Sequence, residues 1–308
     1  MNLRDLKYIL AVAETRHFGR AAERCFVSQP TLSGQIKKLE DELGVTIFER
    51  TNRSVEVTPI GQSVLTHARL LLEQAEAITQ VASAHRDPLA GPLRIGAIPT
   101  LSPYLMPLIL VPLRRRYPQL RLVLSEEITE ALMRRLSQHE LDAVLIATPV
   151  DDPDLDLIPL FDEPFWLAHP RDHALNNKEE IHAEDLEQID LLLLAEGHCL
   201  THQVMEVCHL TERSQRGEMA DLRAASLETL LQLVIAGFGC TLLPALAIRG
   251  GWMSDTGIVA RRLDLPDAYR RISLAYRRTF PRRAALEGFA GVIREHLPNT
   301  VRPLPPAG

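Results

Sequence analysis

The stretch VSQPTLSGQIKKLEDELG, residues 27–44, decides the expected fold of the amino-terminal part of the chain. Ser28 suits the N-cap of a helix, and Pro30 falls in the first turn, where a missing backbone N–H loses no hydrogen bond. Four apolar residues recur at helical spacing and form one face: Leu32, Ile36, Leu39 and Leu43. Gly44 fits the position just beyond the helix, where the left-handed conformation favours glycine. The stretch therefore predicts a helix between Ser28 and Gly44.

Two further helices are expected before this one. Residues 3–14 place five apolar side chains on one helical face: Leu3, Leu6, Ile9, Leu10 and Ala13. The short segment RAAERCF, residues 20–26, then leads through a tight turn into the helix of residues 28–44, a pattern typical of helix-turn-helix motifs. Two β-rich pieces surround residues 51–53, as in a hairpin wing. Residues 1–58 are therefore predicted to form a winged helix-turn-helix.

A long helix is predicted directly after the wing. Thr58 and Pro59 match the N-cap and first-turn preferences of a helix start. Apolar residues then follow one stripe, with two more beside it: Ile60, Val64, Leu71, Ile78 and Val81, with Leu65 and Leu72. Because so long a stripe on an isolated helix needs a partner surface, residues 59–87 are predicted to be a linker and dimerisation helix that ends before Pro88.

From Leu93 onward, expected strands alternate with expected helices, which predicts an α/β domain with mostly parallel sheets covered on both faces. The domain is expected to span residues 88–300. Its length favours two α/β subdomains around a cleft, as in periplasmic binding proteins. One is expected at about residues 91–163 plus 267–300, and the other at 164–266. Residues 301–308 are predicted to be a flexible tail.

Composition restricts the class of protein. The chain has 308 residues, 46% of them hydrophobic, and a net charge of −6. It contains no apolar run of 18 or more residues and no secretory signal pattern, so we expect a cytoplasmic, nucleoid-associated protein with no membrane partner. Residues 1–90 carry equal numbers of basic and acidic side chains, so charge alone does not indicate nucleic acid.

The segment GHCLTHQVMEVC, residues 197–208, holds two of the four cysteines. Spacing alone leaves open buried packing, thiol redox chemistry and metal binding. Metal binding is the weakest, because no Cys-x2–4-Cys anchor accompanies His198, His202 and the cysteines, so no metal is predicted. If the segment is helical, Cys199 and Cys208 lie on opposite faces, roughly 13 Å apart along the axis. A disulfide needs Cα atoms within about 7 Å, so it requires the helix to unwind.

The remaining cysteines, Cys25 and Cys240, are expected to be small buried apolar side chains. Within the pair, Cys199 sits at the expected helix N-terminus, where free N–H groups and the helix dipole favour a thiolate. Cys208 lies near the other end, beside Val207, and has no such help. If thiol chemistry operates, Cys199 is therefore the expected attacking thiol and Cys208 the resolving one.

The order of parts resembles the LysR-type transcriptional regulators over nearly the whole chain, and residues 3–61 resemble the winged helix-turn-helix of that family. Three further segments resemble its peroxide-sensing members: EPFWLAHPRDHAL at 163–175, AEGHCL at 195–200, and SLETLLQLVIAGFGCTLLPALA at 226–247. The resemblance implies an activator, not an enzyme, that senses hydrogen peroxide by oxidation of Cys199 and a reversible Cys199–Cys208 disulfide. It implies no cofactor.

The resemblance also implies site residues and partners. A peroxide pocket is expected from Thr100, Thr129, His198 and His202. His202 follows Thr201, where relatives commonly have an Arg-Asp pair. The expected partners are double-stranded DNA with approximately palindromic promoter sites, RNA polymerase and identical subunits in a tetramer (a dimer of dimers). The expected DNA-binding residues are Arg4, Gln29, Pro30, Thr31, Ser33, Gln35, Lys37, Lys38, Arg50 and Arg53.

Two alternative functions remain open from the sequence: a metabolite-responsive regulator and a thiol peroxidase. A regulator of the same family can respond to a small metabolite in the interlobe cleft and leave its cysteines idle. A thiol-dependent peroxidase would use the same cysteines as a turnover site, but the predicted DNA-binding head argues against an enzyme.

Overall fold

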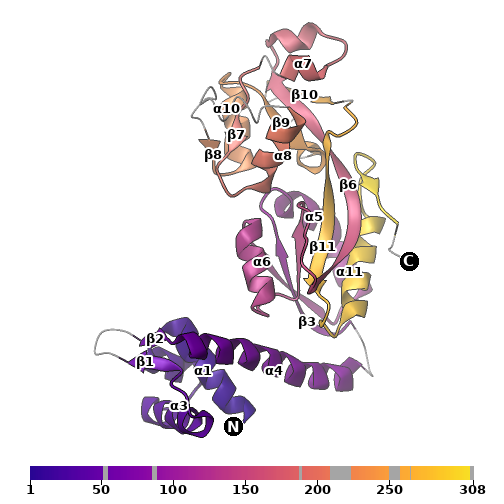
Figure 1. The fold of residues 1–308 in the computed structure, drawn as a ribbon. Helices are drawn as coiled ribbons and strands as arrows, with labels where there is room; N and C mark the ends of the chain where they lie inside the picture. The colour runs from indigo at the N-terminus through magenta and orange to yellow at the C-terminus, as the bar shows by residue number, and fades with distance from the viewer. Residues whose placement is uncertain are drawn as a thin grey trace. The chain divides into compact units, whose positions relative to one another are not determined.

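The computed structural model describes residues 1–50, 55–84, 89–186, 189–208, 223–249, 257–263 and 265–305 (Figure 1). The chain divides into two compact units, residues 1–87 and 88–308. Within the described residues, no helix is both long and apolar enough to cross a membrane.

The first unit contains four helices and a two-stranded hairpin in its described part: α1 (Leu3–Thr15), α2 (Phe18–Arg24), α3 (Gln29–Leu43), β1 (Phe48–Arg50), β2 (Val55–Val57) and α4 (Pro59–Ala84). The predicted limits of α3 are confirmed. The Ser28 hydroxyl accepts a hydrogen bond from the backbone N–H of Thr31, and Gly44 adopts a left-handed φ of 68°. The hairpin pairs antiparallel, with Phe48 opposite Val57. These elements form the expected winged helix-turn-helix.

The predicted apolar face of α1 is partly wrong. Leu6 and Ile9 are buried as expected, but Leu3 is 47% exposed, whereas Tyr8 and Val12 are buried. The reason is that α1 contacts α2, α3 and α4, so its buried arc is wider than a single stripe and is turned away from Leu3. This three-sided packing places α3 on the surface of the unit with its polar side exposed.

The apolar residues of α4 divide into two sets. Leu65 and Ala68 are buried against the core that α1, α2 and α3 share. Ile60, Leu71 and Ile78 are exposed, and Ile78 is 73% exposed. These three residues recur at intervals of 11 and 7 and therefore share one face of the helix. The predicted stripe thus contains a face that the single chain leaves in solvent.

The second unit is a mixed α/β domain. Its described strands are β3 (Gly91–Ala97), β4 (Leu120–Glu126), β5 (Ala143–Ile146), β6 (Leu155–Pro170), β7 (Leu193–Leu194), β8 (Arg223–Ala224), β9 (Thr241–Pro244), β10 (Ile258–Arg262), β11 (Tyr269–Arg277) and β12 (Arg302–Pro303). Its helices are α5 (Ser102–Arg116), α6 (Thr129–Ser137), α7 (Ala183–Leu186), α8 (Cys199–Val207), α10 (Leu227–Ile235) and α11 (Arg283–Glu295), with short 3₁₀ turns at Ala174–Asn177 and Ala245–Arg249.

The expectation of mostly parallel sheets is wrong. In the eight-stranded sheet only β3 pairs in parallel, with β4 and β5, whereas β6 pairs antiparallel with β9, β10, β11 and β12. The physical reason is the 16-residue strand β6, whose first half pairs with β11 and second half with β9 and β10. Long return strands, and not only βαβ crossovers, therefore build this sheet.

Two hydrophobic cores lie along β6, one on each side of the middle of the strand. Phe161 belongs to the first core, which contains residues of β3, β5, β11, α5 and α11. Phe165 belongs to the second core, which contains residues of β7, β9, α8 and α10. We call the parts of the unit around these cores the first lobe and the second lobe. The strand passes through both, so the lobes share one backbone ladder.

The prediction of a flexible tail over residues 301–308 is wrong for its described part. Val301 is buried, and Arg302–Pro303 forms strand β12, which pairs with Asp162 and Phe161 of β6. The Leu304 N–H also donates to the Leu160 carbonyl at 2.9 Å. Proline is tolerated here because an edge strand does not need every N–H for pairing.

Candidate functional site

Helix α8 begins at Cys199. Gly197 has a φ of +95°, a left-handed conformation that favours glycine, and turns the chain into the helix. His198 occupies the N-cap without a side-chain cap hydrogen bond, so the first-turn N–H groups that surround the cysteine have no capping side chain. The Cys199 side chain is partly buried and packs against the first core. This position combines access with a positive helix terminus.

Cys208 directly follows the last residue of α8 and lies in the second core. Its N–H donates to the Val204 carbonyl at 3.0 Å, which continues the helical hydrogen bonding as far as the cysteine. Burial raises the pKa of the Cys208 thiol to about 12. The condition of a helical segment between the two cysteines is met, and both thiols are free. Their separation along the axis is roughly 13 Å, so no disulfide forms without unwinding.

A cavity of about 1210 Å³ lies beside the start of α8. Its walls include Cys199 and three of the four predicted pocket residues: Thr129, His198 and His202. Gln203 and Arg270, which the sequence did not single out, also line it. The cavity is formed by the start of α6, the start of α8 and the start of β11, and therefore by parts of both lobes.

Thr100, the fourth predicted pocket residue, is buried and does not line this cavity. Its hydroxyl and carbonyl oxygens instead accept hydrogen bonds from the Arg270 guanidinium, at 2.8 and 2.9 Å. Arg270 Nε donates to Glu163 at 2.9 Å, and the other oxygen of Glu163 accepts from the Leu246 N–H at 2.8 Å. Thr100 therefore helps to hold Arg270, a residue that borders the cavity but whose side chain is completely buried.

Two side-chain oxygens at the cavity wall lack hydrogen-bond partners. Thr129 Oγ1 and Gln203 Oε1 are both buried and unpaired within the described structure, while Gln203 Nε2 donates to the Ala147 carbonyl at 2.7 Å. Unpaired buried oxygens are uncommon and costly, by about 1–3 kcal/mol each. Because Thr129 and Gln203 line the same cavity as Cys199, its wall suits a small hydrogen-bonding molecule beside the thiol.

The two residues after Leu200 have different environments. The Thr201 hydroxyl is buried and donates to the Leu194 carbonyl at 3.0 Å, so this side chain anchors α8 to β7. The His202 side chain is 78% exposed, and its Nδ1 lies 3.6 Å from Oε1 of Glu206, one helical turn later. The imidazole therefore stands at the rim of the cavity and faces solvent, not the thiol.

Two further features of the described residues bear on the site: the grouping of potential metal ligands, and the environments of Cys25 and Cys240. Among the described residues, no three His, Cys, Asp or Glu side chains gather in a way that could hold a metal ion. Cys240 is fully buried, as expected, and Cys25 is partly buried against the first unit's core. Burial raises the pKa of both thiols, that of Cys240 to about 11.

The predicted DNA-contacting residues mostly lie on the exposed side of the first unit. Ser33 is half-buried, and Arg53 together with the Arg50 side chain lies outside the described residues. The exposed residues are Arg4, Gln29, Pro30, Thr31, Gln35, Lys37 and Lys38. Since Leu32, Ile36 and Leu39 face the core, the exposed residues of α3 stand on the opposite side of the helix.

Comparison with known proteins follows the same division of the chain. Residues 3–62 match the model of the bacterial regulatory helix-turn-helix protein, lysR family, and residues 86–298 match the LysR substrate binding domain. The chain is 43% identical over 297 residues to the hydrogen peroxide-inducible genes activator of Dickeya chrysanthemi, covering 96% of each chain. It is equally similar to the DNA-binding transcriptional dual regulator OxyR of Escherichia coli K12, over the same shares.

The chain is also similar to solved structures of OxyR proteins. Full-length OxyR C199D from Pseudomonas aeruginosa matches with a TM-score of 0.79 and 42% identity, over 96% of this chain and 95% of that one. A hydrogen peroxide-bound cysteine mutant of OxyR from Corynebacterium glutamicum matches with a TM-score of 0.66 and 36% identity, over 96% and 92%.

Proposed function

Since the chain belongs to the LysR family of bacterial regulators, we propose that it is a DNA-binding activator that senses hydrogen peroxide through Cys199. The observation that carries the proposal is the position of this thiol, at the start of α8 and on the wall of a cavity with unpaired hydrogen-bonding oxygens. Relatives that are named for hydrogen peroxide support it.

The first chemical step is attack of the Cys199 thiolate on one peroxide oxygen. The O–O bond breaks, Cys199 becomes a sulfenic acid, and the second oxygen leaves as water after it takes up a proton. Thr129 Oγ1 and Gln203 Oε1 accept hydrogen bonds from the two O–H groups of the peroxide. The Arg270 guanidinium is buried behind the cavity wall and fixed by Thr100 and Glu163, and from there its positive charge stabilises the negative charge on the departing oxygen.

The second step joins the two cysteines. The Cys208 sulfur displaces the hydroxyl of the Cys199 sulfenic acid, a disulfide forms and a second water leaves. Because α8 holds the two thiols on opposite faces, the helix must unwind first. When the disulfide forms, Cys208 leaves its packing position in the second core and becomes covalently linked to Cys199 beside the first core. This change of packing is the signal.

DNA binding and assembly belong to the first unit. The exposed N-terminal turns of α3 enter the major groove, with Gln29, Thr31 and Gln35 toward base edges and Lys37 and Lys38 toward phosphates. The exposed face of α4, with Ile60, Leu71 and Ile78, pairs with a second chain. Two such dimers form a tetramer on an approximately palindromic promoter site, where the activator contacts RNA polymerase. The protein acts in the cytoplasm and uses no cofactor.

Transcription in vitro tests this function. Promoter DNA is first selected by the reduced full chain from random fragments, and transcripts are then measured with and without hydrogen peroxide. The wild type is expected to respond and Cys199→Ser to give no response, whereas Cys25→Ser is the control that responds normally. An equal response in Cys199→Ser removes the thiol from the sensing step.

The volume of the cavity favours one alternative function. About 1210 Å³ is far more than hydrogen peroxide occupies and is somewhat above the usual range of small-ligand sites, roughly 300–1,000 Å³. A LysR regulator of a small metabolite would use this space and leave both cysteines idle. That function predicts the wild-type response of Cys199→Ser and a rise in thermal stability with the metabolite.

A further inference from the structure

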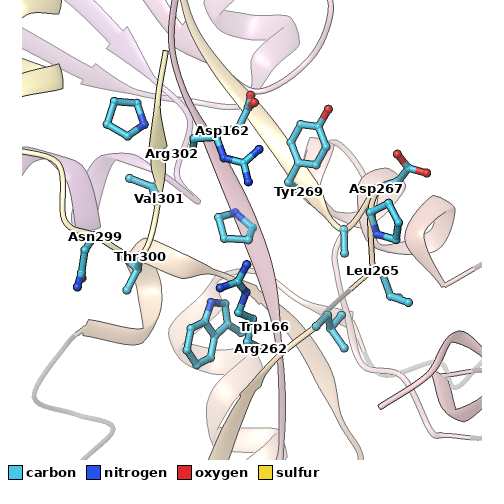
Figure 2. A pocket seen from close by; sticks show the side chains of 15 residues that line it. Asp162, Trp166, Arg262, Leu265, Asp267, Tyr269, Asn299, Thr300, Val301 and Arg302 are labelled. Atoms are coloured by element: carbon cyan, nitrogen blue, oxygen red, sulfur yellow. The ribbon is translucent and has the colours of Figure 1, made fainter. Parts of the chain in front are cut away.

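We propose that the regulatory unit carries a second ligand site, for a small aromatic carboxylate, in a cavity separate from the one beside Cys199. This cavity of about 760 Å³ lies where β10 and β12 both meet β6, and it has the size of a small-ligand pocket (Figure 2). Its wall contains Val301 of the first core and Leu263 of the second, so it lies at the border of the two lobes.

The floor of the cavity follows from the pleat of β6. Asp162, Pro164 and Trp166 alternate along the strand and line the cavity, whereas the residues between them, Glu163 and Phe165, are fully buried on the other face. β12 pairs with β6 at Asp162, and β10 pairs with it up to Trp166. The cavity opens between the ends of these two strands.

Two arginines carry the charge of the site. Arg302 stands opposite Asp162 in the ladder, but the Asp162 carboxylate is taken by Arg271 on the other side, at 2.8 and 3.1 Å. Arg262 stands opposite Trp166, which offers no anion. Neither Arg262 nor Arg302 has an ion pair or hydrogen bond within the described structure, unlike Arg270, Arg271 and Arg278 of the neighbouring strand β11 and its end.

The polar groups around the two guanidinium groups also lack partners. Trp166 Nε1 and Thr300 Oγ1 are buried and make no hydrogen bond within the described part of the chain. Figure 2 shows the Arg262 guanidinium beside the Trp166 indole, with Thr300 and Asn299 on the neighbouring segment before β12. Among the described residues of the wall, Asp267 is the one further acid, and it lies beyond Tyr269 and away from both guanidinium groups in this view.

These groups define the chemistry of the ligand. The Arg262 guanidinium binds a carboxylate and Arg302 adds positive charge to the same cavity, while the N–H of Trp166 and the hydroxyl of Thr300 supply further donors. The indole, Pro164 and Leu265 form an apolar wall on which a flat ring packs. A ligand there contacts β10 and β12 together, and Tyr269 lines both this cavity and the one beside Cys199. Binding of a ligand in this cavity is therefore expected to affect how the two lobes pack along β6.

The test uses the full-length reduced protein and 4-fluorobenzoate as the probe, followed by ¹⁹F NMR line broadening. We expect binding to weaken by roughly tenfold or more in Arg262→Gln and in Arg302→Gln. Arg121→Gln, which removes an exposed arginine of β4, is the matched control and should bind as the wild type does. Both site arginines are exposed, so the variants are expected to fold, and thermal melts check this.

A neutral probe and an inorganic one complete the design. 4-Fluorobenzamide should bind at least tenfold more weakly than 4-fluorobenzoate, because it lacks the charge that the arginines recognise. Binding of 4-fluorobenzoate that is unchanged in both arginine variants overturns the proposal. So does the absence of binding, or binding of inorganic phosphate alone, since a phosphate-only site has no use for the apolar wall.

Discussion

Cys199 and Cys208 stand at the two ends of α8, where Cys199 packs against the first core and Cys208 is buried in the second. This relationship explains why the two thiols coexist without a disulfide. It also sets the cost of joining them, because the bond requires Cys208 to leave a site where it is 1% exposed. The stability of the second lobe and the redox state of the pair are therefore linked.

Burial of Cys208 predicts a pH effect on stability. The pKa of its thiol is raised from 9.0 to about 12 by burial, so the folded state favours the neutral form. The resulting stabilisation is fully present below pH 9 and is lost as pH rises from 9 toward 12, up to on the order of 4 kcal/mol. The difference in unfolding free energy between wild type and Cys208→Ala should fall across this window. A constant difference contradicts the buried thiol.

Several features of this site were predictable from the sequence because their signals are local. The opposite faces of Cys199 and Cys208 follow from their spacing once the segment is helical, and residues 199–207 are. Arg270 was not predicted, because its burial depends on Glu163, which lies 107 residues away and carries no local signal.

Long-range pairing also explains the errors in the fold. Three prolines, Pro159, Pro164 and Pro170, interrupt the strand pattern of β6 in the sequence. Its antiparallel partners arrive about 70 to 140 residues later in the chain. The proline-rich end likewise suggested disorder, whereas β12 forms because β6 offers it an edge.

The Thr129 hydroxyl is predicted to serve a ligand and not the fold. Thr129→Val keeps the shape and removes a buried oxygen that has no partner, so stability should be unchanged or slightly higher. The rate of Cys199 oxidation by hydrogen peroxide should fall by about tenfold, the loss of roughly one hydrogen bond. Stopped-flow oxidation and thermal melts measure the two effects.

The matched control is Thr241→Val, whose hydroxyl donates to the Leu192 carbonyl at 2.9 Å in the second core. It should lose about 1 kcal/mol of stability and keep its reactivity. If Thr129→Val oxidises as fast as the wild type, Thr129 has no place in the peroxide site.

Arg270 is predicted to contribute to both stability and reactivity, and the two can be separated. Arg270→Met leaves the buried Glu163 carboxylate without its partner, which should cost about 3–5 kcal/mol. Adding Glu163→Gln removes that charge and should recover much of the stability, as read from denaturant unfolding. Peroxide reactivity should stay low in the double variant. Recovery of full reactivity with stability shows that Arg270 acts only through the fold.

The exposed face of α4 is predicted to hold the dimer. Ile78→Glu places a charge where Ile78, 73% exposed in the single chain, packs against a second chain. The dimer dissociation constant should rise by at least about tenfold, as measured by sedimentation equilibrium. Gln74→Glu, an exposed residue of the same helix, is the control and should leave assembly unchanged. Equal assembly of both variants places the dimer contact elsewhere.

Mass mapping of disulfides shows whether Cys199 and Cys208 form a switch. The full chain is treated briefly with a low concentration of hydrogen peroxide, free thiols are blocked, and the peptides are identified after digestion. We expect a linked Cys199–Cys208 peptide that is absent before treatment, and in Cys208→Ser a trapped sulfenic acid at Cys199. If both cysteines stay reduced and Cys199 resists sulfenic-acid trapping, the thiols are packing residues and the cavity serves another ligand.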